Sequence, residues 1–228
     1  MRLDTYILRL DTSILIPLTF GNVILIRYLS LRTLGTMKTL TLPRKKQILN
    51  TAKQLFKDKG YSAASMRVLA KEVGLEPASL YSHFKSKEEI LKTICFSMAD
   101  EFLEIFEAIN NTVPNHTDRL KTAIDAHVRI IVDNLDAASV FFNDWMYLSA
   151  ESLEQFLAMR KTYEQAFRLM IEEGIFSGDF KMMDVDFTVR LTFATLNSTH
   201  EWYKPTGTVS PKDVGNKMSE FILNGISV

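Results

Sequence analysis

Hydrophobic residues recur every three or four positions along most of the chain, and no segment shows the strict alternation of a half-buried strand. Glycine, proline or small polar residues separate the periodic segments, as expected at helix ends. The pattern therefore predicts a chain built from helices. They are expected over residues 44–59, 66–73, 77–84, 87–110, 119–135, 137–148, 152–173, 185–204 and 211–224.

The first three predicted helices form a unit of their own. Gly60 and Gly74 end the first two helices, Ser65 can cap the second, and Pro77 suits the first turn of the third. Two short helices that are joined by a tight turn and backed by a longer helix make a helix-turn-helix. In that motif the second short helix enters the major groove of DNA with its N-terminal residues leading.

This unit supplies the candidate DNA contacts. Leu80 and Phe84 are four residues apart and face inward, so the residues around them face outward. Small side chains at the start of the helix let its backbone approach the bases, and longer ones such as Tyr81, His83 and Lys87 can reach phosphates. The candidate contacts are Arg44, Ser65, Arg67, Ala78, Ser79, Tyr81, Ser82, His83 and Lys87.

Charge is unevenly distributed over the 228 residues, although 27 Lys and Arg balance 27 Asp and Glu. Residues 37–87 contain eleven basic and three acidic side chains, whereas residues 88–228 contain 12 basic and 22 acidic ones. A basic block of this kind favours a polyanion as its partner, and the acidic remainder favours a different role. A net charge of zero therefore does not exclude DNA binding.

The first 36 residues stand apart from this plan. Residues 14–31 are the most apolar stretch of the chain, but Pro17, Gly21 and Arg27 interrupt it. We expect translation to begin at Met37, so that residues 1–36 are upstream sequence or a disordered leader. The alternative is a membrane-tethered helical interaction protein that uses residues 14–31 as its anchor, and without such a leader no membrane contact is expected.

Several motifs of the basic unit resemble one family. The run from Leu80 to Glu89, LYSHFKSKEE, resembles the segment that closes the DNA-binding domain of TetR-type transcriptional regulators. The apolar residues and glycines between Ile48 and Gly74 fit the same domain, whereas Glu76 stands where many relatives have a small hydroxyl cap. The resemblance implies an all-α homodimer that binds an operator with two-fold symmetry in double-stranded DNA.

The resemblance also implies a division of labour along the chain. Residues 37–85 are expected to be the DNA-binding domain, and residues 86–228 a helical bundle that binds an effector and forms the dimer. Residues 178–180 and 199–205 resemble the branch of the family that responds to acyl-CoA thioesters, so an acyl-CoA is an expected small-molecule effector. Effector binding would favour a dimer that no longer fits the operator, which is the behaviour of a repressor.

Two polar residues lie on apolar helix faces of the acidic part. An unpaired buried guanidinium is unfavourable, so Arg160 pairs with an acid, extends to the surface, or faces an acidic ligand in a cavity. His127 is either a core histidine with hydrogen-bond partners or a ligand contact. The candidate ligand-binding residues are His127, Phe141, Trp145, Arg160, Tyr163 and Phe167.

The predicted helix over residues 185–204 is apolar on two faces, a pattern typical of a helix that is buried on all sides. In TetR-type regulators the last two long helices pair with those of a second subunit, which implies that role for residues 185–224. The candidate dimer-interface residues are Phe187, Leu191, Ala194, Val214, Met218 and Phe221.

The sequence offers no catalytic or metal-binding constellation. Its four histidines lack the spacing of metal ligands, and no glycine-rich phosphate loop or nucleophile elbow occurs. We therefore expect no enzyme activity, no metal and no cofactor. Cys95 is the only cysteine, which excludes an intramolecular disulfide and favours a cytoplasmic location.

Overall fold

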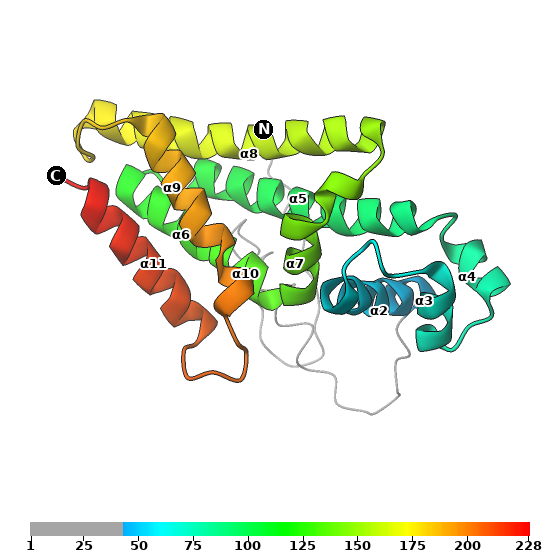
Figure 1. Cartoon of the computed structure of the whole chain (residues 1–228). Helices are drawn as coiled ribbons and strands as arrows, with labels where there is room; N and C mark the ends of the chain where they lie inside the picture. Colours follow the sequence, from blue (N-terminus) through cyan, green and yellow to red (C-terminus); the bar gives the residue numbers. More distant parts are fainter. Residues whose placement is uncertain (1–42) are drawn as a thin grey trace, which may run out of the picture. The chain divides into compact units, whose positions relative to one another are not determined.

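The computed structural model describes residues 43–228, which are helical over most of their length (Figure 1). In this part of the chain the only β-type pairing is an isolated bridge between Phe180 and Ser227, so the all-α prediction is confirmed. The predictions for residues 1–36 lie outside the described residues. The helices are α2 (Arg44–Lys59), α3 (Met66–Val73), α4 (Pro77–His83), α5 (Lys87–Thr112), α6 (His116–Asp133), α7 (Leu135–Asn143), the short 3₁₀ helix η1 (Trp145–Tyr147), α8 (Ala150–Ser177), α9 (Val185–Asn197), α10 (Thr199–Trp202) and α11 (Pro211–Ile226).

The predicted helix-turn-helix is present as α2, α3 and α4, and its boundaries follow from local chemistry. The hydroxyl of Ser65 accepts a hydrogen bond from the N–H of Val68 and caps α3. Gly74 ends α3 with a left-handed φ of 68°, a conformation that glycine adopts without strain. Pro77 occupies the first turn of α4, where its missing N–H leaves no bond unmade.

Two predicted helices are divided in the structure. The helix expected over 137–148 is α7, which starts two residues earlier, followed by η1. The helix expected over 185–204 is interrupted at Ser198, which separates α9 from α10. Its hydroxyl donates to the carbonyl of Thr195, and such back-bonding by serine weakens regular helix in a run of Asn-Ser-Thr.

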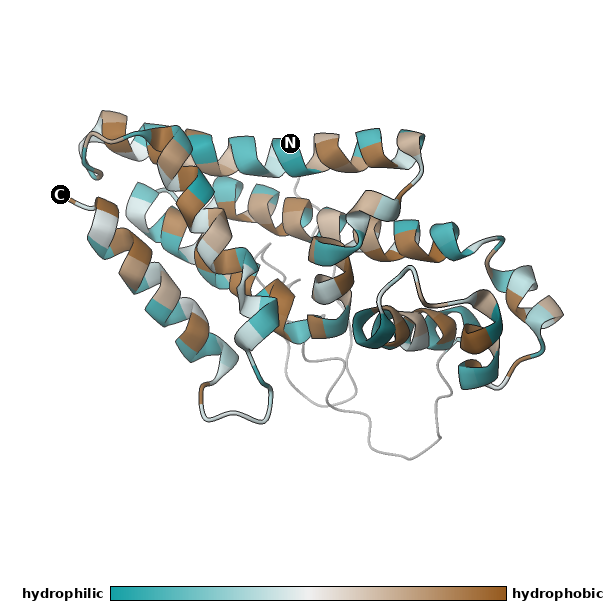
Figure 2. Ribbon diagram, viewed as in Figure 1, coloured by the Kyte–Doolittle hydropathy of each residue, from teal (hydrophilic) through white to brown (hydrophobic). Residues whose placement is uncertain are grey.

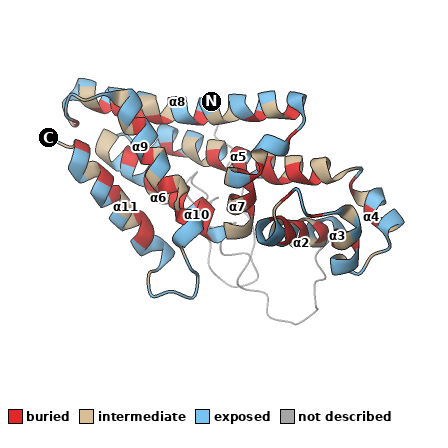
Figure 3. Cartoon of the chain, viewed as in Figure 1, coloured by how far each residue is buried: buried red, intermediate tan, exposed pale blue. Residues whose placement is uncertain are grey.

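The longest helices, α5 and α8, lie side by side and contribute much of the core of the acidic part (Figure 1). α6 packs against α5 and α8 on one side and along α11 on the other. Figure 3 shows buried residues gathered where these helices face one another. Aromatic rings dominate this core, and the fully buried ring of Phe156 packs edge to face against the ring of Phe141 with centroids 5.2 Å apart.

The helix-turn-helix contacts the helical bundle through α5, α7 and η1. The ammonium of Lys57 on α2 forms an ion pair of 2.7 Å with the carboxylate of Asp136 on α7. The ring of Tyr61, which follows α2, stacks on the ring of Tyr147 in η1 with centroids 5.2 Å apart. α7 and η1 are thus in direct contact with α2 and with the residue that follows Gly60.

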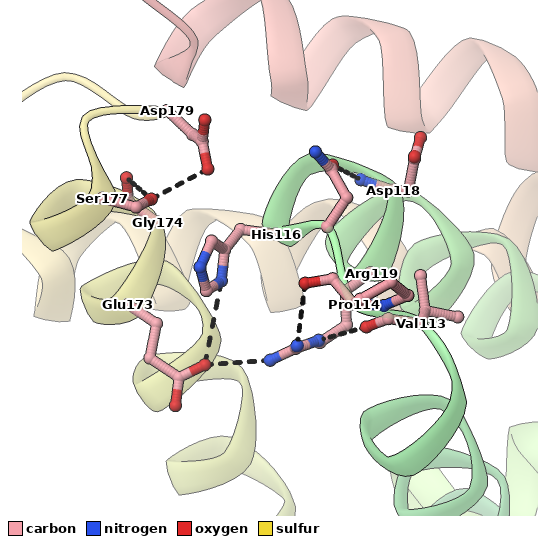
Figure 4. Close-up of polar contacts among 10 residues, drawn as sticks. Val113, Pro114, His116, Asp118, Arg119, Glu173, Gly174, Ser177 and Asp179 are labelled. Carbon is pink, nitrogen blue, oxygen red and sulfur yellow. Dashed lines mark hydrogen bonds and ion pairs between the residues drawn. The ribbon is translucent and has the colours of Figure 1, made fainter.

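A second polar cluster fastens the turn between α5 and α6 to the end of α8 (Figure 4). The guanidinium of Arg119 donates to the carbonyls of Val113 (2.8 Å) and Pro114 (3.2 Å) and to the carboxylate of Glu173 (2.9 Å). His116 lies beside the same carboxylate, at 3.8 Å. Arg119 thus stabilises this end of the bundle, far along the chain from the helix-turn-helix.

Candidate functional site

One side of α4 faces the protein and the other is exposed. Leu80 and Phe84, which directly follows the helix, are fully buried, whereas half of the Tyr81 side chain (50%) is exposed. The hydroxyl of Ser82 donates to the carbonyl of Ser79 at 2.7 Å, so it is engaged within the helix. The candidate contacts that lie on α4 with exposed or half-buried side chains are Ala78, Ser79, Tyr81, Ser82 and His83.

Three further candidate contacts come from α2, α3 and the turn between them. The guanidinium of Arg44 donates to Gln47 at 2.7 Å and to the carbonyl of Gly74 at 3.4 Å, which places it at the α3–α4 turn. Arg67 is exposed on α3, and Ser65 is exposed at its cap. The structure therefore brings basic and small polar side chains around one exposed short helix, an arrangement suited to phosphate and base contacts.

Lys87, an expected phosphate contact, also makes contacts inside the protein. Its ammonium donates to the carbonyls of Tyr61 and Ala64, both at 2.8 Å, and lies 4.1 Å from the centre of the Tyr61 ring. Two of its three N–H groups are thereby used inside the protein. Lys87 fastens the α2–α3 turn to the start of α5. Its third N–H group is left for the expected phosphate contact, which stays a prediction.

Substitution of Lys87 by methionine should therefore destabilise the protein. The methionine keeps most of the apolar stem but leaves the carbonyls of Tyr61 and Ala64 without their donor, at about 2 kcal/mol of unfolding free energy. Lys85→Met is the matched control, since the Lys85 side chain is exposed. Urea unfolding of both variants measures the effect. Equal unfolding free energies of Lys87→Met and Lys85→Met would show that the internal hydrogen bonds of Lys87 do not stabilise the protein.

A small cavity lies in the core between α5, α6, α7, α8 and α9. Its volume is about 30 Å³, enough for a water molecule or two but not for an effector without movement of its walls. Rings make up most of the lining, together with a few polar groups at one side. The lining residues are Ala99, Phe102, His127, Phe141, Phe142, Met159, Arg160, Tyr163, Glu164, Phe193 and Asn197.

His127 is the buried polar group of this cavity. The hydroxyl of buried Tyr163 has no other acceptor among the described residues, so it donates to Nδ1 of His127, at 3.2 Å, and the ring proton of His127 is on Nε2. Nε2–H then donates to Oδ1 of Asn197 at 3.1 Å. Burial lowers the pKa of His127 to about 3, and it raises the pKa of Tyr163, so both groups are neutral at physiological pH.

Four of the six candidate ligand-binding residues line the cavity, and two do not. His127, Phe141, Arg160 and Tyr163 are in its wall. Phe167 is fully buried in the core beyond it, and Trp145 lies on the outer side, where its ring contacts the guanidinium of Arg160 at 5.4 Å. Arg160 of α8 is half-buried at the edge of the cavity. This position fits the alternative in which its guanidinium faces a ligand in a cavity.

The neutrality of buried His127 predicts a pH-dependent stability. The histidine titrates near 6.5 when unfolded and near 3 when folded, so protons bind preferentially to the unfolded chain as the pH falls below 6.5. Between pH 7 and pH 5 the wild type should lose about 2 kcal/mol more unfolding free energy than His127→Gln, which does not titrate. Urea titrations at both pH values measure this difference. Equal losses in the two proteins would contradict the prediction.

A wider polar groove adjoins the cavity and shares part of its lining. The groove has a volume of about 440 Å³ and lies along the exposed sides of α8 and α9. Four basic side chains face two acidic ones there, which gives it a net positive charge. Arg168 forms ion pairs with Asp186 and, at 3.6 Å, with Glu172. The charged lining residues are Arg160, Lys161, Arg168, Arg190, Glu164 and Asp186.

The candidate dimer-interface residues separate into two groups. Phe187 (58%), Leu191 (52%) and Phe221 (72%) are exposed hydrophobic side chains of α9 and α11, and Ala194 is exposed beside them. Val214 is buried within its own subunit and cannot contact another, so its assignment to an interface is corrected; Met218 is half-buried. Figure 2 shows hydrophobic residues along α9 and α11. Because Phe187 and Leu191 of α9 are exposed, the helix predicted over residues 185–204 is not buried on all sides within one subunit.

Some further features bear on the kind of protein. Within residues 43–228, no three histidine, cysteine or acidic side chains are grouped as metal ligands, and none of the helices is long and apolar enough to cross a membrane. Burial raises the pKa of the Cys95 thiol to about 12, which makes it a poor nucleophile. The stretch proposed as an anchor, residues 14–31, lies outside the described residues.

Two family models match the chain, and between them they span most of the described residues. Residues 48–94 match the model for bacterial regulatory proteins of the tetR family, and residues 114–226 match the model for tetracyclin repressor-like C-terminal domains. The chain is 26% identical over 186 residues to the HTH-type transcriptional repressor KstR2 of Mycolicibacterium smegmatis, covering 81% of this chain and 91% of that protein.

Solved structures resemble this one over most of its length. The TetR family transcriptional regulator PfmR from Thermus thermophilus is 30% identical, with a TM-score of 0.72 over 78% of this chain and 97% of that one. AibR, solved in complex with isovaleryl coenzyme A and operator DNA, is 21% identical and has the same fold, with a TM-score of 0.71 over 78% of this chain and 97% of that one. The exposed α4, the bundle behind it and these matches together assign the chain to the TetR family of DNA-binding transcriptional regulators.

Proposed function

We propose that the protein is a homodimeric repressor that is released from its operator by an acyl-CoA thioester. The observation that carries this proposal is the apolar cavity that opens into a positively charged groove. An acyl-CoA has the matching polarity, since its acyl group is apolar and its nucleotide part carries phosphates. Arginine and lysine side chains are suited to phosphates, and the rings are suited to the acyl group.

Relatives support both parts of the proposal. KstR2 is described as a transcriptional repressor, and AibR was solved with an acyl-CoA and with operator DNA. The exposed hydrophobic residues of α9 and α11 supply an apolar surface for a second subunit, which would place two copies of α4 on a two-fold symmetric operator. The protein would act in the cytoplasm, where its operator lies.

The route from effector to DNA would run through α7. Phe141 and Phe142 of α7 line the cavity, which must widen to admit an acyl group. The same helix is tied to α2 by the ion pair between Asp136 and Lys57. An effector that binds better to the widened state shifts the population toward it, and the two copies of α4 then no longer match the operator.

Fluorescence anisotropy with DNA from upstream of the protein's own gene tests this function. The affinity should fall steeply as the salt concentration rises from 50 to 300 mM, because phosphate contacts release counterions. Isovaleryl-CoA or octanoyl-CoA should weaken binding by about tenfold or more, whereas free CoA and the free acids should not. An operator affinity that does not change with salt concentration would exclude DNA as the partner. An operator affinity that no acyl-CoA changes would exclude this effector class.

A further inference from the structure

The cavity and the groove meet at four shared residues. Arg160, Glu164, Phe193 and Asn197 line both spaces. An effector with its acyl group in the cavity and its phosphates in the groove must cross this boundary. The thioester joins the acyl group to the pantetheine arm, which leads on to the phosphates, and the thioester carbonyl oxygen accepts hydrogen bonds.

Only some of the boundary residues can donate to that oxygen. Glu164 is an acceptor when ionised, and Phe193 has no polar atom. The guanidinium of Arg160 lies against the ring of Trp145, on the outer side. The side chain of Asn197 makes one hydrogen bond within residues 43–228, and that bond uses its carbonyl oxygen. The NH2 group of Asn197 therefore has no acceptor among these residues. Asn197 therefore holds an unused donor at the boundary.

His127 decides which way this amide points. An asparagine amide can turn over and exchange its oxygen with its nitrogen at almost no change in shape. Nε2–H of His127 is a donor, so it can form a hydrogen bond only when Oδ1 of Asn197 faces it, as it does at 3.1 Å. His127 is itself fixed, since Nδ1 accepts from Tyr163 and the ring stacks on Phe102 with centroids 4.7 Å apart.

We propose that the NH2 group of Asn197 donates a hydrogen bond to the thioester carbonyl oxygen of the effector, and that His127 is the positioning residue that orients this amide. The inference rests on the proposed function. It adds that the protein distinguishes an acyl thioester from a ligand of the same length without the carbonyl oxygen. A bound ligand lacking that oxygen would cover the amide donor without offering it an acceptor.

Matched pairs of ligands test this proposal by isothermal titration calorimetry. Isovaleryl-CoA and octanoyl-CoA are compared with S-isopentyl-CoA and S-octyl-CoA, thioethers that lack only the carbonyl oxygen. The wild type should bind each thioester about tenfold more tightly than its thioether. Asn197→Leu should bind the two members of a pair within about twofold of each other, and Gln165→Leu, which changes a residue that lines only the groove, should discriminate like the wild type.

Variants of the positioning residue separate orientation from mere packing. His127→Phe keeps an aromatic ring but cannot donate, so discrimination should fall, whereas His127→Gln keeps a donor and should restore it. If Asn197→Leu is unstable, Asn197→Asp keeps the acceptor for His127 and removes the NH2 group, and discrimination should again be lost. Equal binding of thioester and thioether by the wild type would overturn this inference alone. Binding of neither would overturn the proposed function and the inference with it.

Discussion

Ala78→Glu is expected to weaken operator binding by about a hundredfold without loss of stability. Ala78 is exposed in the first turn of α4, and the N-terminal end of this helix is the one expected to lead into the major groove. A carboxylate there meets the phosphates of DNA, and such like-charge contacts cost several kcal/mol. Because a dimer presents two copies of α4, the operator experiences the change twice. The same carboxylate interacts favourably with the N-terminal end of the helix dipole, so the folded state should not suffer.

A matched variant isolates the effect of position from that of charge. Ala158→Glu makes the same substitution at an exposed site on α8, away from α4, and should leave operator affinity within about twofold of the wild type. Anisotropy titrations at fixed salt give the affinities, and thermal unfolding gives the stabilities. If Ala78→Glu binds the operator like the wild type, α4 does not enter the groove by its N-terminal end.

The helix-turn-helix could be predicted closely because short-range signals fix its boundaries. Met66–Val73 was placed to the residue, since Ser65 and Gly74 determine its ends by a side-chain cap and a left-handed φ. The exposed and buried sides of α4 also follow from the four-residue spacing of Leu80 and Phe84. The internal hydrogen bonds of Lys87 could not be predicted in this way, because its partners, the carbonyls of Tyr61 and Ala64, lie more than 20 residues away.

The cavity could be predicted only in part, because it forms between five helices. The aromatic-rich segment 137–148 indicated Phe141, and the apolar stripe of the helix over 152–173 indicated Tyr163. That stripe also contains Phe167, and only the packing of α8 decides which of Tyr163 and Phe167 lines the space. Phe102, Phe142 and Met159 were missed, although each lies in a helix that was predicted. Asn197 gave no signal at all, since nothing in its neighbourhood in sequence indicates a contact with His127, 70 residues away.

The second large effect is expected on stability, from Gly174→Ala. Gly174 is buried in α8, and a Cβ atom at this position would overlap with the ring of Phe180, which is itself buried. That ring cannot retreat easily. The N–H groups of Asp179 and Phe180 both donate to the carbonyl of Gly174, at 2.9 Å each, and Lys181 donates to Ile226 of α11 at 2.8 Å. Overpacking against such a fixed ring should cost about 3 kcal/mol of unfolding free energy, or roughly 10 °C in Tm.

Gly225→Ala is the control, because it makes the same change in a helix where nothing lies within 4 Å of the added Cβ. There the alanine should be neutral or stabilise the protein by up to about 1 kcal/mol, through its better helix propensity. The opposite signs of the two substitutions would show that the loss at Gly174 comes from the ring of Phe180 and not from removal of a flexible residue. Calorimetric unfolding of both variants measures the difference. If Gly174→Ala gains stability as Gly225→Ala does, the turn that carries Phe180 must be able to move away from α8. The hydrogen bonds of that turn would then not hold the ring of Phe180 in a fixed position.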